Sequence, residues 1–170
     1  DSHRLAAGYL EQLEASGRPV YVVPGNHDVS NPDAVRYSGD QEEPVLSVTA
    51  AEFAQVYDAY GYGEALDRDP ASLSYVAEPV SGLWLLALDA CRYAENVAGE
   101  GHVVDGRFSP ETLAWIEAKL AEAVRQGKAV IAMMHHGVVE HYKTQEKEFG
   151  EYLVDDYPDV SRLLAMYNAR

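Results

Sequence analysis

The stretch Val20-Tyr21-Val22-Val23-Pro24-Gly25-Asn26-His27-Asp28 indicates the fold class more clearly than any other part of the sequence. Its apolar run, residues 20–23, ends at a proline and a glycine, which predicts a buried strand followed by a sharp loop. Gly25 allows the backbone to turn without a Cβ clash. The loop would present Asn26 and His27 at the carboxyl end of a strand, where open α/β sheets place ligands. We therefore expect an α/β protein with a polar site in this loop.

A second apolar run also ends in polar residues. Residues 129–134, Ala-Val-Ile-Ala-Met-Met, predict a buried strand that delivers His135 and His136 at its carboxyl end. A lone histidine at a strand end is more often structural than functional. Beside the Asn26-His27 loop we favour a metal-binding role for His135. His136 is left open between facing a substrate, bonding the backbone and exchanging roles with His135.

These two blocks resemble the calcineurin-like metallophosphoesterases, whose central motif is Gly-Asn-His-Asp or Gly-Asn-His-Glu. The resemblance implies that Asn26 is a ligand of one metal in a two-metal site. It implies that His27 faces the phosphate as general acid and that Asp28 orients His27 by a hydrogen bond. It also implies that His135 is a metal ligand. An amide oxygen is a hard, neutral ligand that suits Mn, Mg, Fe or Zn, so the chemistry agrees with the role of Asn26.

The resemblance further implies an αββα sandwich and an enzyme that hydrolyses phosphate mono- or diesters. Two divalent metal ions (Mn, Fe, Zn or Mg) would act as cofactors, with metal-bound hydroxide as the nucleophile. We expect His136 and His141 to border the substrate cleft. The substrate itself and the identity of the metals stay open.

Several motifs of the resembled family lack a counterpart in a suitable place. The family carries Asp-x-His and Gly-Asp-x-x-Asp before the central motif, and Gly-His-x-His near the end. Asp1-Ser2-His3 matches in letters, but no strand precedes it. Gly39 to Glu43 ends in Glu and follows the central motif, and Gly101 to Val104 lacks the second histidine and precedes His135. Asp1 or Ser2 fits better as the cap of a helix. We therefore expect residues 1–170 to form one partial domain that lacks its first strands and its C-terminal part. Alone, it would be inactive and would expose strand edges that favour self-association.

Two other functions compete with this interpretation. The cluster of His135, His136, Glu140 and His141 could form a mononuclear zinc hydrolase, although its letters fit no standard zinc motif. That site would keep its metal when Asn26 is replaced, whereas the two-metal site would not. The second alternative is a degenerate phosphoesterase fold that serves as a binding module.

Composition narrows the class of partners. The 170 residues include 28 acidic and 13 basic side chains and carry a net charge of −15, which opposes binding to nucleic acid or an anionic membrane. The single cysteine, Cys91, excludes an intramolecular disulfide. No apolar run reaches membrane-spanning length, so we expect a soluble protein, either cytoplasmic or exported.

The remaining pattern predicts the other elements. Helices are expected over about 2–15, from the capping box Thr49–Glu52 to Tyr60, from Ser109 to Gly127, and from about Pro158. Paired strands are expected at 72–77 and 83–88, and a long surface loop at 29–47. The expected inward residues are, in chain order, Leu5, Leu10, Leu13, Leu113, Ile116, Leu120, Val124, Val160, Leu163, Leu164 and Tyr167.

Overall fold

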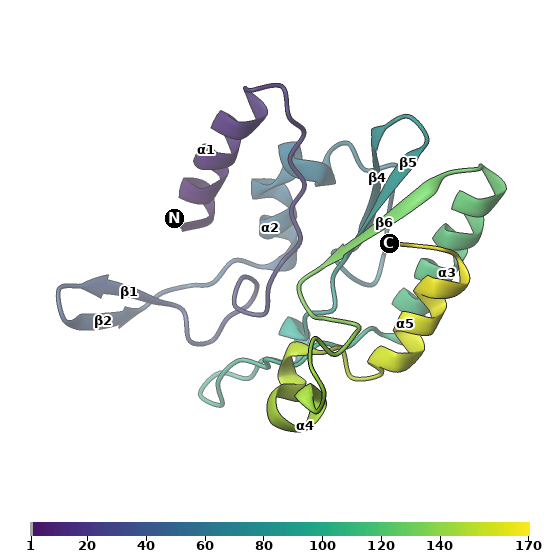
Figure 1. Cartoon of the computed structure of the whole chain (residues 1–170). Coiled ribbons are helices and arrows are strands. Elements are labelled where there is room, and N and C mark those ends of the chain that lie inside the picture. Colours follow the sequence, from purple (N-terminus) through teal and green to yellow (C-terminus); the bar gives the residue numbers. More distant parts are fainter. Residues whose placement is uncertain (1) are drawn as a thin grey trace.

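A computed structural model describes residues 2–170 (Figure 1). The chain is a mixed α/β structure with two sheets flanked by helices, which confirms the expected fold class. The α-helices are α1 (Ser2–Glu14), α2 (Ala50–Val56), α3 (Pro110–Arg125), α4 (Gln145–Phe149) and α5 (Tyr157–Met166). The strands are β1 (Val35–Ser38), β2 (Gln41–Pro44), β3 (Asp67–Arg68), β4 (Tyr75–Val80), β5 (Leu83–Leu88) and β6 (Ala129–Met134).

The larger sheet has the strand order β3-β4-β5-β6. The β4 and β5 strands pair antiparallel, which confirms the predicted pair, although β4 starts at Tyr75 instead of Ser72. The β5 and β6 strands are parallel, in a register that runs from Leu83 opposite Ala129 to Leu88 opposite Met134. Because parallel strands end at the same edge, the residues that follow β5 and β6 lie together there.

Helices α3 and α5 cover one face of this sheet (Figure 1). Ser109 caps α3 by accepting the Thr112 N–H, and Pro110 is its first residue, as predicted. The core on this side contains Ile116 and Leu120 from α3 and Val160 and Leu164 from α5. These side chains pack against alternate residues of the strands, namely Val76, Trp84, Leu86, Leu88 and Val130.

The opposite face carries a second, aromatic-rich cluster around β4. Phe53 from α2 and Tyr57, which caps the end of that helix, pack with Tyr75 from β4 and with Tyr62. The capping box between Thr49 and Glu52 forms as predicted. The helix is shorter than expected because the chain kinks after Val56 into a π-helical turn, Asp58–Tyr62, in which Gly61 takes a φ of 113°.

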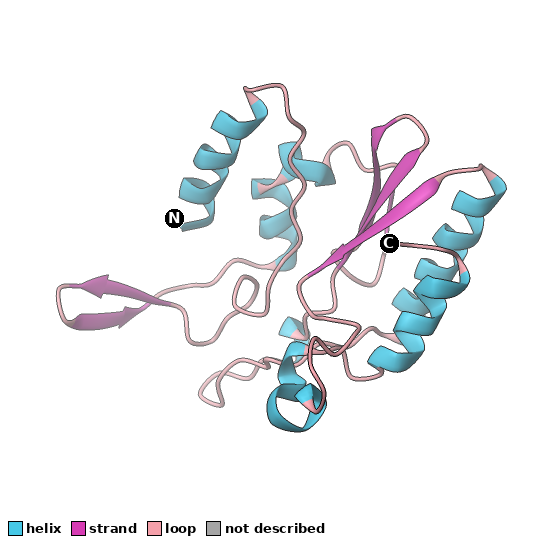
Figure 2. Ribbon diagram, in the orientation of Figure 1, coloured by secondary structure: helices cyan, strands magenta, loops and turns pink. Residues whose placement is uncertain are grey.

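The segment 20–23 is extended but is not a strand, which corrects the first prediction. Figure 2 shows it as a loop that follows α1. Its central residue bonds to a turn and a side chain instead of a neighbouring strand. The Val22 N–H lies 3.1 Å from the Tyr60 carbonyl and 3.2 Å from the Tyr75 hydroxyl, and the same hydroxyl donates to the Val22 carbonyl over 3.0 Å. Residues 20–23 are only partly buried, and the strand prediction failed because an apolar run can pack against the protein without a ladder partner.

Residues 29–47 contain the exposed antiparallel hairpin of β1 and β2, where the sequence predicted only loop. Strand β6 was predicted to be buried, yet Ile131 is 43% exposed because its face of the sheet is not covered there.

Some of the predicted inward residues of the helices are also exposed. Helix α1 buries no residue: Leu5 and Leu13 are exposed, and only Ala7 and Leu10 pack partly against the aromatic cluster. On α3, Val124 is exposed and Ala123 takes the inward place. Asp1, one of the two expected helix caps, lies outside the described residues. Among residues 2–170, no helix has the length and apolar character needed to cross a membrane.

Candidate metal centre

Asn26 and His135, the two predicted metal ligands, lie side by side. His135 follows β6 directly, and Asn26 follows the extended segment that Tyr75 fixes against the sheet. The His135 Nε2–H donates to Asn26 Oδ1 over 2.8 Å, between residues 109 positions apart. A Cβ at Gly25 would come within 3.3 Å of His135 Cε1 and of Asp28 Oδ2. Glycine therefore allows the loop to approach the histidine closely.

Asp28 does not bond His27 in this structure, so that part of the prediction is corrected. The Asp28 carboxylate accepts the Gly25 backbone N–H over 2.7 Å, and the Asp28 carbonyl lies 3.0 Å from His3 Nε2. A short polar side chain commonly bonds to the backbone of its own turn, and here that bond replaces the expected one. The ring of His27 lies instead against His102, with 3.9 Å between the ring centroids.

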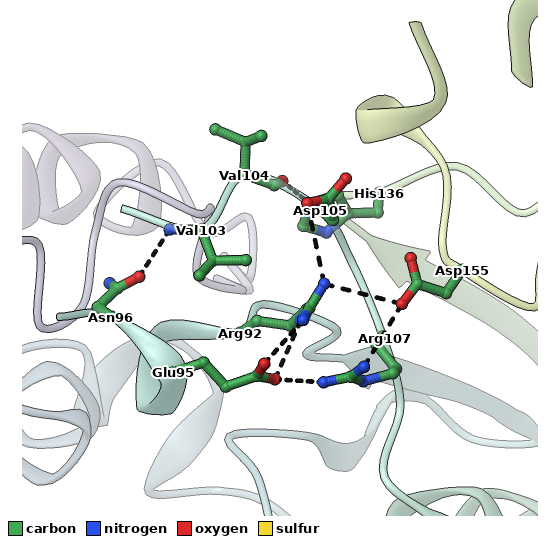
Figure 3. Close-up of polar contacts among 9 residues, drawn as sticks. All are labelled: Arg92, Glu95, Asn96, Val103, Val104, Asp105, Arg107, His136 and Asp155. Carbon is green, nitrogen blue, oxygen red and sulfur yellow. Dashed lines mark hydrogen bonds and ion pairs between the residues drawn. The ribbon is translucent and has the colours of Figure 1, made fainter. Parts of the chain in front are cut away.

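His136 is buried and bonds to the backbone of another loop. Its Nε2–H donates to the Val104 carbonyl over 2.9 Å (Figure 3). Burial is the main reason that the pKa of His136 lies below its ordinary value. A Cβ at Gly106 would fall 2.4 Å from His136 Cγ, so the loop packs directly on the ring. Of the three roles left open for His136, the structure shows the bond to the backbone.

The residues of the zinc alternative do not assemble. His141 borders a cavity of about 840 Å³ together with His135 and His136, and its backbone N–H donates to Gln145 Oε1 over 2.8 Å. Among residues 2–170, no group of three or more His, Cys, Asp or Glu side chains is placed to hold a metal. The structure therefore gives no support to a site formed by His135, His136, Glu140 and His141.

The sequence profile of the calcineurin-like phosphoesterases matches residues 1–165. The chain belongs to the calcineurin-like phosphoesterase family. None of the curated proteins matches it. Membership of the family supports a general role as a metal-dependent phosphoesterase. In such a family, an amide oxygen beside an imidazole nitrogen, as in the contact between Asn26 and His135, is a reason to examine metal binding.

In this calcineurin-like chain, the side chains of Asn26 and His135 could supply two of the ligands that one divalent metal ion needs. An amide oxygen and an imidazole nitrogen are both accepted by Mn, Fe and Zn, and here these atoms face each other. Two neutral ligands do not complete a two-metal centre, which also needs carboxylates to balance the metal charge. The residues therefore fit part of the centre that the family uses.

Next to this pair lies a cavity of about 360 Å³, a volume that accommodates a small ligand. Its lining residues are Asn26, His27, Val104, His135, His136, Glu151 and Tyr152. None of these is a lysine or an arginine, and Glu151 is acidic. The lining residues alone therefore offer little positive charge to a phosphate group.

A cluster of charged residues fixes the loop that carries Val104 (Figure 3). Glu95 accepts hydrogen bonds from Arg92 over 2.7 Å and from Arg107 over 2.5 Å. Both arginines also lie 3.8 Å from Asp155, in the segment that follows α4. The two arginines lower the pKa of Glu95 from 4.5 to about 2. This cluster connects the loop that carries Val104 with the segment that carries Glu151 and Tyr152, and all three residues line the cavity. The sequence did not indicate it.

Asp89, which follows β5, is a structural carboxylate. It accepts the backbone N–H groups of Leu73 and Cys91 and the hydroxyl of Tyr93 over 2.9 to 3.1 Å. Burial raises its pKa in spite of these bonds. Two of these bonds go to the turn that follows Asp89 and one goes to Leu73 before β4, so this carboxylate holds the fold together.

Proposed function

We propose that this chain holds one divalent metal ion through Asn26 Oδ1 and His135 Nε2 and presents His27 to a phosphate mono- or diester. The observation that carries the proposal is the 2.8 Å contact between those two atoms, in a chain of the calcineurin-like family. In a two-metal site the ions supply an activated water as nucleophile and positive charge that stabilises the transition state. His27 is exposed at the cavity, where it can donate a proton to the leaving alkoxide.

The charges around the cavity support a metal-dependent reaction. The chain carries a net charge of −15, and the cavity lining contains Glu151 but no lysine or arginine. A phosphate ester brings further negative charge to this place. Metal ions would therefore be required to compensate it, as they do in phosphoryl transfer generally.

The bridging carboxylate and the other ligands of a two-metal site are not gathered within residues 2–170, since no group of three such side chains is present there. We propose that residues other than these complete the centre. The chain by itself would then bind Mn²⁺ weakly and would not turn over a phosphoester.

The test is a calorimetric titration of the 170-residue chain with Mn²⁺. Asn26→Ala and His135→Ala should each abolish the weak binding. His141→Ala is the matched control, because the His141 ring has no hydrogen bond to a described residue, and it should bind as the unsubstituted chain does. Loss of binding in the control together with retention in Asn26→Ala would favour the zinc site instead. Tight binding of two ions would contradict the partial centre.

A binding module is the second candidate, and the lack of a three-ligand group within residues 2–170 favours it. Hydrolysis of a bis-aryl phosphate separates the two. Turnover that rises with Mn²⁺ and is lost in His27→Ala would exclude both a binding module and the inactivity of the isolated chain. We also propose, from the same charge balance and the exposed edges, that the chain avoids nucleic acid and self-associates.

A further inference from the structure

A second histidine, His102, contacts the ring of His27. The ring centroids are 3.9 Å apart and the planes are inclined by 50°. His102 belongs to the long loop between β5 and α3, far from His27 in the sequence. Its side chain is mostly covered, at 17% exposed, and its Nε2 atom is buried with no hydrogen-bond partner among the described residues.

Asp33 holds His102 in this place by two hydrogen bonds. Asp33 Oδ2 accepts the Nδ1–H of His102 over 2.7 Å and the backbone N–H of His102 over 3.1 Å. The bond from the His102 ring is the main cause that lowers the pKa of Asp33, so the carboxylate is ionised and can only accept. The Nδ1 atom of His102 therefore carries the proton, which fixes the orientation of the ring.

The same loop is bonded to the segment after Asn26 and to His136, the residue after His135. The side chain of Asn96 donates to the Ser30 carbonyl over 3.1 Å and accepts the Val103 N–H over 2.7 Å. The carbonyl of the next residue, Val104, accepts from His136 (Figure 3).

A chain of bonds also links Asp33 back to the backbone of His27. The Asp33 N–H donates to Asn31 Oδ1 over 2.9 Å, and Asn31 Nδ2 donates to the His27 carbonyl over 3.1 Å. Asp33 therefore contacts the surroundings of His27 from two directions, through the His102 ring and through Asn31.

We propose that His102, held by Asp33, is the positioning residue for His27 and takes the orienting role that the family resemblance assigns to Asp28. The contact between the rings restricts the rotamers of His27 and keeps its ring beside the cavity. Asp28 cannot do this here, because its carboxylate closes the turn at Gly25. The inference depends on the proposed function only for the role of His27 as acid.

Proton NMR of the full chain with isotope-labelled histidine tests the arrangement directly. We expect a nuclear Overhauser effect between the ring protons of His27 and His102, and its loss in His102→Ala. In Asp33→Ala, the backbone amides of residues 27–31 should exchange about tenfold faster, because two hydrogen bonds that fix this loop are removed. The ring signals of His27 should shift towards those of an unrestrained histidine in both variants.

Two further variants make the result specific. Asp33→Asn keeps an acceptor oxygen and should restore much of the wild-type His27 spectrum. Asp40→Ala, on the exposed hairpin, removes a carboxylate without a hydrogen bond to a described residue and should change nothing. Absence of the ring contact in the unsubstituted chain would overturn the proposal. So would faster amide exchange in Asp33→Ala with unchanged His27 ring signals, since Asp33 would then only tether the loop.

The test of His102 and the test of the proposed metal site can fail independently of each other. If the ring contact is present but Asn26→Ala leaves Mn²⁺ binding unchanged, the positioning of His27 stands and the metal assignment fails. If Mn²⁺ binding depends on Asn26 but the ring contact is absent, the metal assignment stands and His102 has no positioning role.

Discussion

The Nε2 atom of His135 lies 2.8 Å from Oδ1 of Asn26, across 109 positions of sequence. The two residues reach this contact on different supports: His135 follows β6, and Asn26 follows a segment fixed by the Tyr75 hydroxyl. The atoms that face each other are the ones that bind metal in proteins. The fold thus brings together the two residues that we propose as metal ligands.

Substitution of Asn26 should raise or lower the affinity for Mn²⁺, depending on whether the new side chain carries a ligand atom. Asn26→Asp keeps a side-chain oxygen in place and adds a negative charge, so Mn²⁺ should bind about tenfold more tightly. Asn26→Leu has a similar volume without a ligand atom and should bind no Mn²⁺. Calorimetry at fixed ionic strength measures both. Equal affinities in the two variants would show that Asn26 is not a ligand.

Tyr75→Phe should loosen the segment that leads into the Gly25 loop. The Tyr75 hydroxyl contacts both backbone groups of Val22, and its loss should lower the free energy of unfolding by about 1–2 kcal/mol. Urea unfolding provides the measurement. Tyr37→Phe is the matched control, because Tyr37 is 69% exposed on the hairpin, and its stability should not change. Equal stability of both variants would mean that the Tyr75 hydroxyl does not support the segment.

The same contact explains one limit of prediction from the sequence. The apolar run 20–23 correctly indicated an extended segment that ends at a loop, although its residues are only partly buried. It could not reveal that the segment bonds to a tyrosine hydroxyl more than fifty positions away. Local patterns predict burial and periodicity, whereas a ladder partner is a property of the whole fold.

The sequence likewise identified only some residues of the candidate site. Gly25, Asn26 and His135 were identified because they stand next to apolar runs within motifs of a known family. His102 and Asp33 were missed because two long loops bring them together, and no sequence period marks such a contact. The bond from Asp28 to its own turn follows a local rule that applies to aspartate in general.

Gly106→Ala should destabilise the wall of the cavity. The added Cβ would come 2.4 Å from His136 Cγ, so the buried ring or the loop has to move, at a cost of about 1–3 kcal/mol. Denaturant unfolding measures the loss. Gly150→Ala is the control, since its Cβ would meet no atom within 4 Å and its φ of −59° suits alanine. If both variants are equally stable, Gly106 is not needed for close packing on His136.

Glu95→Gln should lower stability in a pH-dependent way. Arg92 and Arg107 lower the pKa of Glu95 from 4.5 to about 2 in the folded chain, so the ionised group stabilises the fold above pH 4.5. That contribution is lost as the pH falls from 4.5 towards 2. Because Glu95 is 43% exposed and solvent screens the pair, we expect less than about 1 kcal/mol near neutral pH.

The difference in Tm between the unsubstituted chain and Glu95→Gln measures this contribution. It should be largest near neutral pH and should shrink across the acid range. Glu117→Gln, on the surface of α3, is the control and should show no difference at any pH. A difference for Glu95→Gln that is independent of pH would show that the charge of Glu95 is not its source.

Ile131→Lys should weaken self-association through the uncovered side of β6. Ile131 is 43% exposed and borders a largely apolar cavity of about 840 Å³ together with Leu85 and Met133. A lysine at this position disfavours apolar contact between copies of the chain. The dissociation constant of a dimer should therefore rise about tenfold, as expected from the loss of part of a buried isoleucine. Sedimentation velocity over a range of concentrations measures this dissociation constant. Val124→Lys is the control, because it places the same charge at an exposed valine of α3, and it should leave the dimer unchanged. Equal weakening by both variants would indicate a general effect of charge.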